Sequence, residues 1–367
     1  MRLTTFKSQS TQPVIALLTE INEDGRPNFG KVHSFCEELH QGISDLGGSF
    51  YVFSLKSFSE KGVEGFFYNQ DTEEWTKDFL PLPDVIYNRI SSRRTEFSKR
   101  FIDFLNKLDR LGIKFFNHRF LSKWEIHEFL MMEEHLRSFL PETHLYSDSA
   151  LEKMLEQYDE LYIKPVHGSQ GRNIIQLTQS DGLIKVSLSS LPAKIIPPFQ
   201  QDGGLARAIA QLVEKRLCII QQGVQLAEFN GRTMDFRILC HKNAQQFWKV
   251  TSIVARVSAE TFFVSNIARG GEVMKPVYTL ALLFGKEQAR HQLALMKELA
   301  LETAETISRN AAGHHAELGI DIGIDTKGKL WLIEANSKPS KNFEERGSKI
   351  RPSTKAVIDH CYGLCER

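Results

Sequence analysis

Residues 317–340 read ELGIDIGIDTKGKLWLIEANSKPS, and this stretch predicts a β-hairpin. Apolar residues surround Asp321, residues 325–328 supply the chemistry of a turn, and the residues after it alternate as a second strand. If the strands pair, Asp321, Glu334 and Asn336 meet near one end, with the last two on the same face. Such hard oxygen ligands suit Mg²⁺. A surface hairpin with solvated acids explains the stretch about equally well, although an unpaired carboxylate among Leu, Ile and Trp is costly to bury.

The composition is that of an ordinary globular protein. The chain has 367 residues, 41% of them hydrophobic and 25% charged, which is enough for a sizeable core and for two or three domains. The 46 lysines and arginines nearly balance the 45 aspartates and glutamates. This balance gives no electrostatic reason to expect nucleic acid or an anionic membrane surface as a partner.

The cysteines and the N-terminus indicate a compartment. Five cysteines are scattered without the spacing of metal ligands, and an odd number without a secretory segment favours reduced thiols in the cytosol. Residues 1–13 are polar and lack the apolar core of a signal peptide. No run approaches the roughly 18 apolar residues that span a bilayer. We therefore expect a soluble, cytoplasmic protein without a membrane span.

Strands and helices alternate over residues 14–118, which predicts a small parallel α/β domain. Its expected strands are residues 14–19, 49–54, 84–90 and 113–117, and its expected helices are residues 32–46 and 97–111.

Further elements follow this domain. A helix over residues 122–139 is predicted to begin with a capping box of Ser122 and Glu125. Other expected helices are residues 150–158, 205–215, 284–312 and 357–365. The expected strands are residues 161–165, 173–177, 183–187 and 217–222, with 234–241 and 247–256 as an antiparallel pair.

A glycine-rich turn follows the strand that ends in Lys164. Its Gly168 and Gly171, on either side of Ser169, let backbone amides approach a phosphate closely, and Lys164 adds a positive charge. The stretch is not a Walker loop, because no Gly-Lys-Ser/Thr follows and no helix opens there. Taken alone, it is explained as well by a plain hairpin turn.

The stretch 217–237 carries further candidates. Its apolar strand runs into the linker of residues 221–224, whose backbone can hydrogen-bond an adenine edge, while the carboxylate of Glu228 suits ribose hydroxyls. Asp235 and Arg237 lie on one face of the next strand. The alternative for these two is a cross-strand ion pair, which is worth little if exposed.

The order of the candidates is more specific than any one of them. The series runs from Lys123 and Lys164 through residues 221–224, Asp235, Arg237, Arg256 and Asn266 to Asp321, Glu334 and Asn336. This order resembles the ATP-grasp superfamily of carboxylate ligases, and it is most similar to the branch of ribosomal-protein-S6–glutamate ligases. Nearly the whole chain also resembles the endospore coat-associated ATP-grasp family of spore-forming bacteria, notably at residues 28–30 and 84–94.

The resemblance implies a fold of the α/β class. A parallel α/β domain at residues 1–118 is followed by an ATP-grasp fold with antiparallel sheets and α+β organisation. The small lid subdomain is expected at residues 119–220, and the large subdomain with the metal site at residues 221–367.

The resemblance also implies a role for each candidate. Lys123 and Lys164 would contact the phosphates of ATP, under a mobile lid that contains Gly168, Ser169 and Gly171. The adenine would lie against Gln222, Gly223 and Val224, the ribose near Glu228 or Asp235, and Asn266 would also contact the nucleotide. Asp321, Glu334 and Asn336 would hold one or two Mg²⁺ ions, or Mn²⁺. Arg256 would stabilise the phosphorylated intermediate, with Arg237 as a second catalytic arginine.

Three positions depart from the family pattern. Gln222 stands where many relatives have Glu, and Val264 stands where the S6-ligase branch often has Arg. Residues 337–340, Ser-Lys-Pro-Ser, replace the usual ending of small residues and Gly. The first departure bears on the adenine contact, and the other two bear on substrate positioning and rate.

The implied reaction is an ADP-forming ligation. A substrate carboxylate attacks the γ-phosphate of Mg·ATP, and an amine, or less often a thiol or hydroxyl, displaces phosphate from the acyl phosphate. The protein positions the reactants and neutralises charge. One alternative is a nucleotide-binding protein of the spore coat that has little or no turnover, and a less favoured one is phosphoryl transfer of the kinase type.

The partners are expected to be ATP, an unidentified carboxylate and an unidentified nucleophile. The resemblance also leaves room for a homodimer or for spore-coat proteins as partners, and for association with the coat. Residues 88–94, with three arginines, either bind an anionic substrate group or form a surface cluster of salt bridges.

Overall fold

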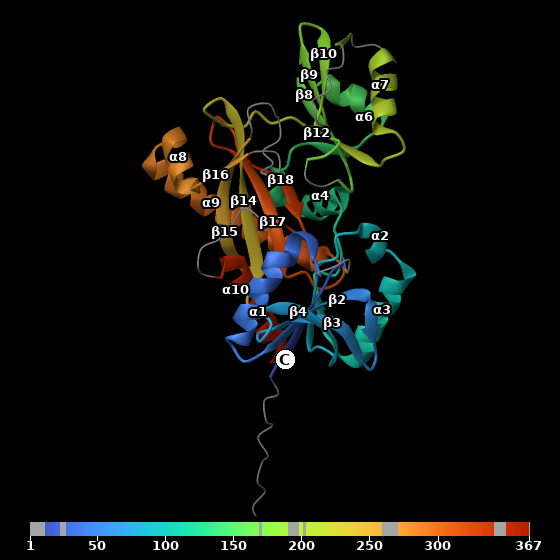
Figure 1. Cartoon of the computed structure of the whole chain (residues 1–367). Helices are drawn as coiled ribbons and strands as arrows, with labels where there is room; N and C mark the ends of the chain where they lie inside the picture. The colour runs from blue at the N-terminus through green and yellow to red at the C-terminus, as the bar shows by residue number, and fades with distance from the viewer. Residues whose placement is uncertain are drawn as a thin grey trace, which may run out of the picture.

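Three sheets follow one another along the chain, and each is built from six strands in the part that the structure describes. The computed structural model describes residues 12–22, 27–168, 171–189, 198–200, 203–258, 271–340 and 350–366. Figure 1 shows the first sheet at the bottom of the view, the second at the top and the third between them. The predicted domain boundaries at residues 118 and 220 stay a prediction.

The first sheet has a parallel core with an antiparallel extension. Its order is β4-β3-β2-β1-β5-β6, and the four strands from β2 to β6 in this order run parallel. The strands are β1 (Val14–Leu18), β2 (Ser49–Ser59), β3 (Gly62–Asn69), β4 (Glu74–Leu80), β5 (Val85–Asn88) and β6 (Lys114–Phe116). The helices are α1 (His33–Ser44), α2 (Arg93–Glu96) and α3 (Lys99–Leu111), with a short 3₁₀ helix at Gly30–Val32.

The parallel core confirms the prediction for residues 14–118, but the antiparallel hairpin of β3 and β4 is a correction. Strand β2 continues to Ser59 instead of ending near Ser54, and β3 pairs with residues 51–53 of β2 and, after a register shift, with Phe58 and Ser59. In β4 only Trp75 is buried, so this edge strand carries little of the apolar alternation by which a strand is recognised.

The second sheet is antiparallel throughout, in the order β11-β10-β9-β8-β12-β7. Its strands are β7 (Thr143–Leu145), β8 (Glu160–Pro165), β9 (Ile175–Ser180), β10 (Leu183–Leu188), β11 (Phe199–Gln200) and β12 (Cys218–Gln222). Helices α6 (Asp148–Leu155) and α7 (Gly203–Val213) share a core with it, in which Met154 and Ile209 meet Leu161 and Ile163.

The third sheet contains the predicted hairpin. Its order is β16-β15-β14-β17-β18, with the short β13 paired to β14. The strands are β13 (Glu228–Phe229), β14 (Arg232–Lys242), β15 (Trp248–Val257), β16 (Glu272–Met274), β17 (Glu317–Ile324) and β18 (Leu330–Asn336). Asp321 pairs with Glu334 and Gly319 with Asn336, which confirms the hairpin and its register.

Helices cover the apolar face of the third sheet. They are α4 (Lys123–Met131), α5 (Glu134–Arg137), α8 (Pro276–Phe284) and α9 (Lys286–Asn310). The capping box of Ser122 and Glu125 is present at the start of α4, as predicted. The single helix predicted over residues 122–139 is wrong, because Glu133 has an extended backbone and divides it, and Leu136 of α5 then packs into the core. No helix in the described ranges is both long and apolar enough to cross a membrane.

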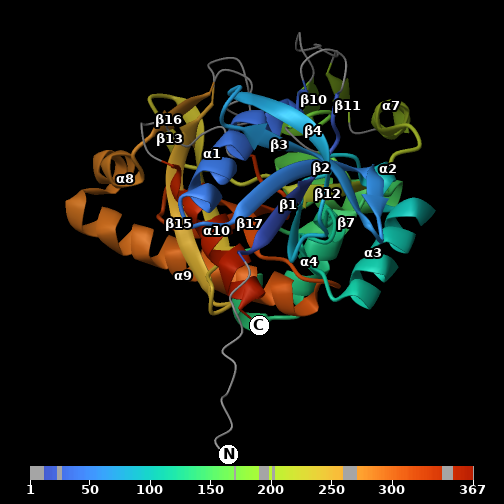
Figure 2. The same cartoon turned by 60° about the horizontal axis from the view of Figure 1, so that its bottom comes forward.

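The C-terminal helix α10 (Pro352–Cys365) joins the first sheet to the third. Its Val357, Ile358 and Cys361 are buried in one core with Phe35 and Leu39 of α1, and the same helix packs on β14 and β15. Figure 2 shows α10 next to α1 and β15. The N-terminal domain and the third sheet are therefore one packed unit.

A buried glutamate, Glu317 at the start of β17, ties these two parts together. Its carboxylate accepts hydrogen bonds from the Tyr87 hydroxyl (2.6 Å), Arg89 Nη1 (3.0 Å) and Asn117 Nδ2 (3.1 Å), and His241 Nε2 lies 3.2 Å away. The Glu317 side chain is fully buried. A carboxylate in this position is stable only because donors from both domains surround it.

We predict that Glu317→Ala lowers the free energy of unfolding by about 3–5 kcal/mol, because it leaves Arg89 buried without its carboxylate. Glu317→Gln keeps an acceptor for Tyr87 and is expected to have a smaller effect. The measurement is urea denaturation followed by circular dichroism. As a control, Glu60→Ala removes an exposed ion pair with Arg110 (2.9 Å) and should change the free energy by less than about 0.5 kcal/mol. Equal effects at Glu60 and Glu317 would show that the buried cluster is not a stabilising contact.

Candidate functional site

One large cavity lies where the three sheets meet. Its volume is about 1570 Å³, and it is lined by Arg89 and Ser91 of the N-terminal domain, Lys164 of the second sheet, and Asp321 and Glu334 of the third. Pockets for small molecules usually measure about 300–1000 Å³. This cavity therefore has room for more than one ligand.

Most of the predicted site residues line this cavity. They are Lys164, Gly171, Gln222, Val224, Glu228, Asp235, Arg237, Arg256, Asp321, Glu334 and Asn336. Lys123 lies beside them, because its ammonium contacts Glu334. The predicted residues Ser169 and Asn266 lie outside the described residues.

Gly168 and Gly223 do not line the cavity. Gly223 donates its backbone N–H to the carbonyl of Glu160 (2.7 Å), and a Cβ at this position would lie 2.7 Å from the same oxygen. Close packing of the linker on β8 therefore requires glycine here, whatever the linker binds. At Gly168 a Cβ would lie 3.1 Å from the carbonyl of Pro165, in the turn after β8.

Two ion pairs cross the strands of the third sheet. Arg256 is opposite Asp235 and contacts both of its carboxylate oxygens, and Arg237 is opposite Asp321 and contacts both of its oxygens. Arg256 Nη2 also lies 3.2 Å from Asp321 Oδ2, which links the two pairs. Asp235 and Arg237 were expected to pair across strands as one alternative, and they do so, each with a partner on a neighbouring strand. We call these four residues the charge ladder.

Burial and charge oppose each other in the ladder. Burial disfavours ionisation of Asp321, but the charges and hydrogen bonds of Arg237 and Arg256 outweigh it and hold the pKa of the Asp321 carboxyl below its ordinary value. Burial also disfavours the charged form of Arg256, and the two aspartates more than compensate and raise its pKa. Asp321 and Arg256 are therefore ionised at neutral pH, and their mutual contacts hold them in fixed geometry.

Two lysines stand at the edge of the ladder. Lys123, the first residue of α4, contacts Glu334 Oε1 at 2.5 Å, and its backbone N–H donates to Val166 after β8 (3.1 Å). Lys164 Nζ donates to Gln221 Oε1 at 2.5 Å. Burial lowers the pKa of the Lys164 ammonium to about 8, with a smaller lowering from Lys123 that Glu334 and Asp321 oppose.

The donor set fits a magnesium ion. Asp321, Glu334 and Asn336 line the same cavity with carboxylate and amide oxygens. Both oxygens of Asp321 also accept from Arg237, and Glu334 is paired with Lys123, so a bound ion would share these carboxylates with their cationic partners. In the described ranges, no three His, Cys, Asp or Glu side chains gather as a metal site of their own. Mg²⁺ commonly binds through one or two carboxylates and the phosphates of its substrate, so this smaller donor set suits it.

The sequence analysis missed a polar group on the side of the cavity formed by the second sheet. Glu160 Oε1 accepts from the Tyr162 hydroxyl (2.7 Å) and from Gln176 Nε2 (2.7 Å), and all three residues line the cavity. A signal was present, since Glu160 and Tyr162 precede Lys164 at intervals of two along β8 and so share its face.

Two arginines of the loop at residues 88–94 make contacts that neither prediction specified, and binding of an anionic substrate group stays a prediction. Arg89 is a buried ion-pair partner of Glu317 and also lines the cavity. Arg93 donates to the carbonyl of His167 in the turn after β8 and lies over the Phe120 ring, 4.7 Å from its centroid. The structure therefore assigns these two arginines to contacts between domains.

Comparisons with known proteins match this chain to one family. The sequence profile of YheC/D-like ATP-grasp proteins matches residues 112–364. The endospore coat-associated protein YheD of Bacillus subtilis is 31% identical over 315 residues, which cover 83% of this chain and 67% of YheD.

Two solved structures share the fold. The ATP-grasp ligase PsnB, complexed with a minimal precursor, has a TM-score of 0.54 at 15% identity and covers 95% of this chain and 100% of its own. The D-Ala:D-Ser ligase VanG of Enterococcus faecalis has a TM-score of 0.53 at 11% identity and covers 97% of this chain and 100% of its own. The predicted ATP-grasp fold is confirmed.

We predict that the affinity of the protein for ADP depends on pH through Lys164. ADP serves here as a ligand that tests the predicted nucleotide site. Because its pKa is about 8, Lys164 loses its proton between pH 7 and pH 9, and a neutral amine no longer attracts phosphate. Bound phosphate is expected to keep Lys164 protonated in the complex, so above pH 8 binding must include the uptake of a proton. The affinity for ADP should therefore fall about tenfold between pH 7 and pH 9. Isothermal titration calorimetry at several pH values measures it. Lys164→Arg stays charged and should remove most of the dependence, and an unchanged dependence in this variant would show that another group titrates.

Proposed function

Since this chain belongs to the YheC/D-like ATP-grasp family, we propose that it is an ATP-dependent, ADP-forming ligase that joins a carboxylate to an amine or related nucleophile. One observation carries the proposal most strongly. Two lysines, two arginines and the Asp321, Glu334 and Asn336 oxygens gather around one cavity, although they come from segments spread between residues 123 and 336.

In this proposal the nucleotide lies between the second and third sheets. Lys123 and Lys164 would contact its phosphates, and residues 222–224 would lie along the adenine. For the ribose, Glu228 is the better candidate, because both carboxylate oxygens of Asp235 already accept hydrogen bonds from Arg256. Gln222 lines the cavity and offers an amide where the carboxylate of many relatives would stand.

Asp321, Glu334 and Asn336 would hold Mg²⁺, or Mn²⁺, against the phosphates. The ion would neutralise charge on the transferred phosphoryl group. Lys123 and Glu334 form an ion pair with each other. A phosphate and a divalent cation would separate this pair together, so the binding of nucleotide and of metal should be coupled.

The remaining steps need positioning rather than covalent catalysis. A substrate carboxylate would attack the γ-phosphorus, which gives an acyl phosphate and ADP, and the nucleophile would then displace phosphate at the acyl carbon. Arg237 and Arg256 are held rigidly by their aspartates, which suits donors that stabilise charge developing on the phosphoryl oxygens. The second substrate would occupy the part of the cavity lined by Arg89 and Ser91.

The relatives suggest the cellular setting. YheD and YheC of Bacillus subtilis are named endospore coat-associated proteins. We propose the same association for this chain, with spore-envelope material or coat proteins as the source of the substrates. A nucleotide-binding role without turnover is the competing proposal, and it is favoured by Gln222 in the linker.

The deciding experiment measures ADP release from ATP with a panel of carboxylates and amines. We expect Glu334→Gln to lower the rate about 10²- to 10³-fold at saturating ATP, because an electrostatic contact to the reacting phosphates is lost. Glu298→Gln, an exposed change on α9, is the control and should leave the rate unchanged.

Asp321→Asn should act like Glu334→Gln but also weaken the fold, because its partners Arg237 and Arg256 are buried. Thermal stabilisation by Mg·ATP with no ADP release in any combination would favour the binding role instead.

Arg256→Ala is expected to reduce turnover far more than ADP affinity, because this arginine is assigned to the reacting phosphoryl group. Calorimetry gives the affinity, and coupled ADP release gives the rate. A loss restricted to ADP binding would show that Arg256 contacts the bound nucleotide instead. Asp235→Asn serves as the comparison, since it disturbs the position of Arg256 but keeps its charge.

A further inference from the structure

The residues directly after β18 are held by the N-terminal domain and by the segment that leads into α4. The Ser337 hydroxyl accepts from the backbone N–H of Leu121 (2.9 Å), and the carbonyl of Pro339 accepts from Arg89 Nη2 (3.0 Å). Between them, Lys338 Nζ donates to the carbonyl of Ile90 (3.1 Å) and to Glu96 of α2. We call the contacts of residues 337–339 with Arg89, Ile90 and Glu96 the clasp.

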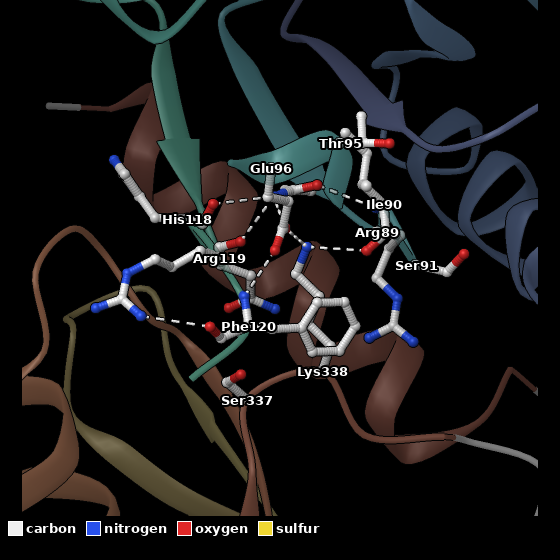
Figure 3. A network of polar contacts seen from close by, with 12 residues as sticks. Arg89, Ile90, Ser91, Thr95, Glu96, His118, Arg119, Phe120, Ser337 and Lys338 are labelled. Atoms are coloured by element: carbon white, nitrogen blue, oxygen red, sulfur yellow. Dashed lines mark hydrogen bonds and ion pairs between the residues drawn. The ribbon is translucent and has the colours of Figure 1, made fainter. Parts of the chain in front are cut away.

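Figure 3 shows the centre of the clasp, where the Lys338 ammonium points at the Glu96 carboxylate and the Ile90 carbonyl. Glu96 also accepts from Asn88 Nδ2 (3.0 Å) and from the backbone N–H of Phe120 (2.8 Å). The Phe120 ring lies under the ammonium, 4.9 Å from its centroid to Nζ. The Lys338 ammonium and the Glu96 carboxylate therefore both have hydrogen-bond partners in addition to each other.

The Lys338–Glu96 pair is unusually buried for an ion pair. The Lys338 side chain is 2% exposed and the Glu96 side chain 1%. Removing two charges from water costs several kcal/mol per ion, and the attraction between them often does little more than offset this cost. Stability alone is thus a poor explanation for the pair, and a role in fixing the position of its segment is a better one.

The clasp connects two walls of the cavity. On one side, Ser337 follows Asn336, the last residue of β18, which is opposite Gly319. On the other side, Arg89 and Ile90 line the part of the cavity formed by the N-terminal domain. Pro339 packs so closely on the third sheet that a Cβ at Gly319 would lie 2.6 Å from the Pro339 Cβ. The end of β18 is thereby fixed from both sides.

We propose that Lys338 is a positioning residue, which uses Glu96 of the N-terminal domain to hold the end of β18 so that the Asn336 oxygen faces the same point as Glu334. The proposal rests on the proposed function, because that function assigns Asn336 to the metal. It also gives a reason for the Ser-Lys-Pro-Ser ending that departs from the family pattern. Residues that orient metal ligands typically change metal affinity about 10- to 100-fold when altered.

The test separates positioning from stability with a double variant. Lys338→Met and Glu96→Gln each leave one buried charge without its partner and should lower the melting temperature. The double variant K338M/E96Q removes both charges and should recover most of the melting temperature, while residues 337–339 lose their ionic tether. If the pair only stabilises the fold, metal affinity recovers as well.

The measurement is calorimetric titration of ADP at a series of Mg²⁺ concentrations. For the double variant we expect ADP affinity without Mg²⁺ to match the wild type, and the Mg²⁺ concentration for half-maximal enhancement to rise about tenfold. Hydrogen exchange of the ligand-free protein should be faster at residues 335–340 but unchanged in β17. The control double variant R309M/E133Q removes an ion pair between α9 and the turn before α5, and it should change neither quantity.

Each result decides between named outcomes. A Mg²⁺ dependence equal in the wild type and in K338M/E96Q overturns the positioning role and leaves the proposed function intact. A wild-type protein whose ADP affinity ignores Mg²⁺ overturns both. If the double variant does not fold, Glu96→Gln alone is measured in the same way, because its amide keeps the shape and most hydrogen bonds of Glu96.

Discussion

The register of the third sheet is the constraint on which the site depends. Asp235 and Arg237 flank Phe236 on β14, and Ile320 and Ile322 flank Asp321 on β17. Phe236 and the two isoleucines are fully buried in the core under α4 and α9, so the alternate residues must face the cavity. A slip of one residue in any of these strands would bury the charges and expose the core. Hydrophobic burial on one face thus fixes the geometry of the charge ladder on the other.

The same alternation explains what the sequence could predict. The hairpin at 317–336, with Asp321 opposite Glu334, follows from apolar spacing and turn residues, and the structure has it. Sequence also predicted the capping box that places Lys123 at the start of α4. It could not show which partner each charge would take, because Arg256 reaches Asp235 only after residues 243–247 reverse the chain into an antiparallel strand.

Other features escaped prediction for physical reasons. The edge strand β4 buries one side chain, so its pattern is too weak to be recognised. In the sequence, Lys338 stood out only as part of an ending that departs from the family pattern. Its burial could not be predicted, because nothing in the neighbouring residues indicates that a lysine will be buried. Its partner Glu96 is 242 residues away in the sequence, and only the packing of the N-terminal domain on the third sheet brings the two together.

The attachment of the three sheets is unequal, and this bears on how the cavity would work. Helix α10, the Glu317 cluster and the clasp join the N-terminal domain to the third sheet. In the part of the chain that the structure describes, the elements of the second sheet pack chiefly against one another. Elements with few contacts to the rest open at low free energy. The end of β18, proposed to hold the metal, and the wall proposed for the second substrate therefore belong to the fixed part of the cavity. Admission and enclosure of a nucleotide would fall to the second sheet, which carries Lys164.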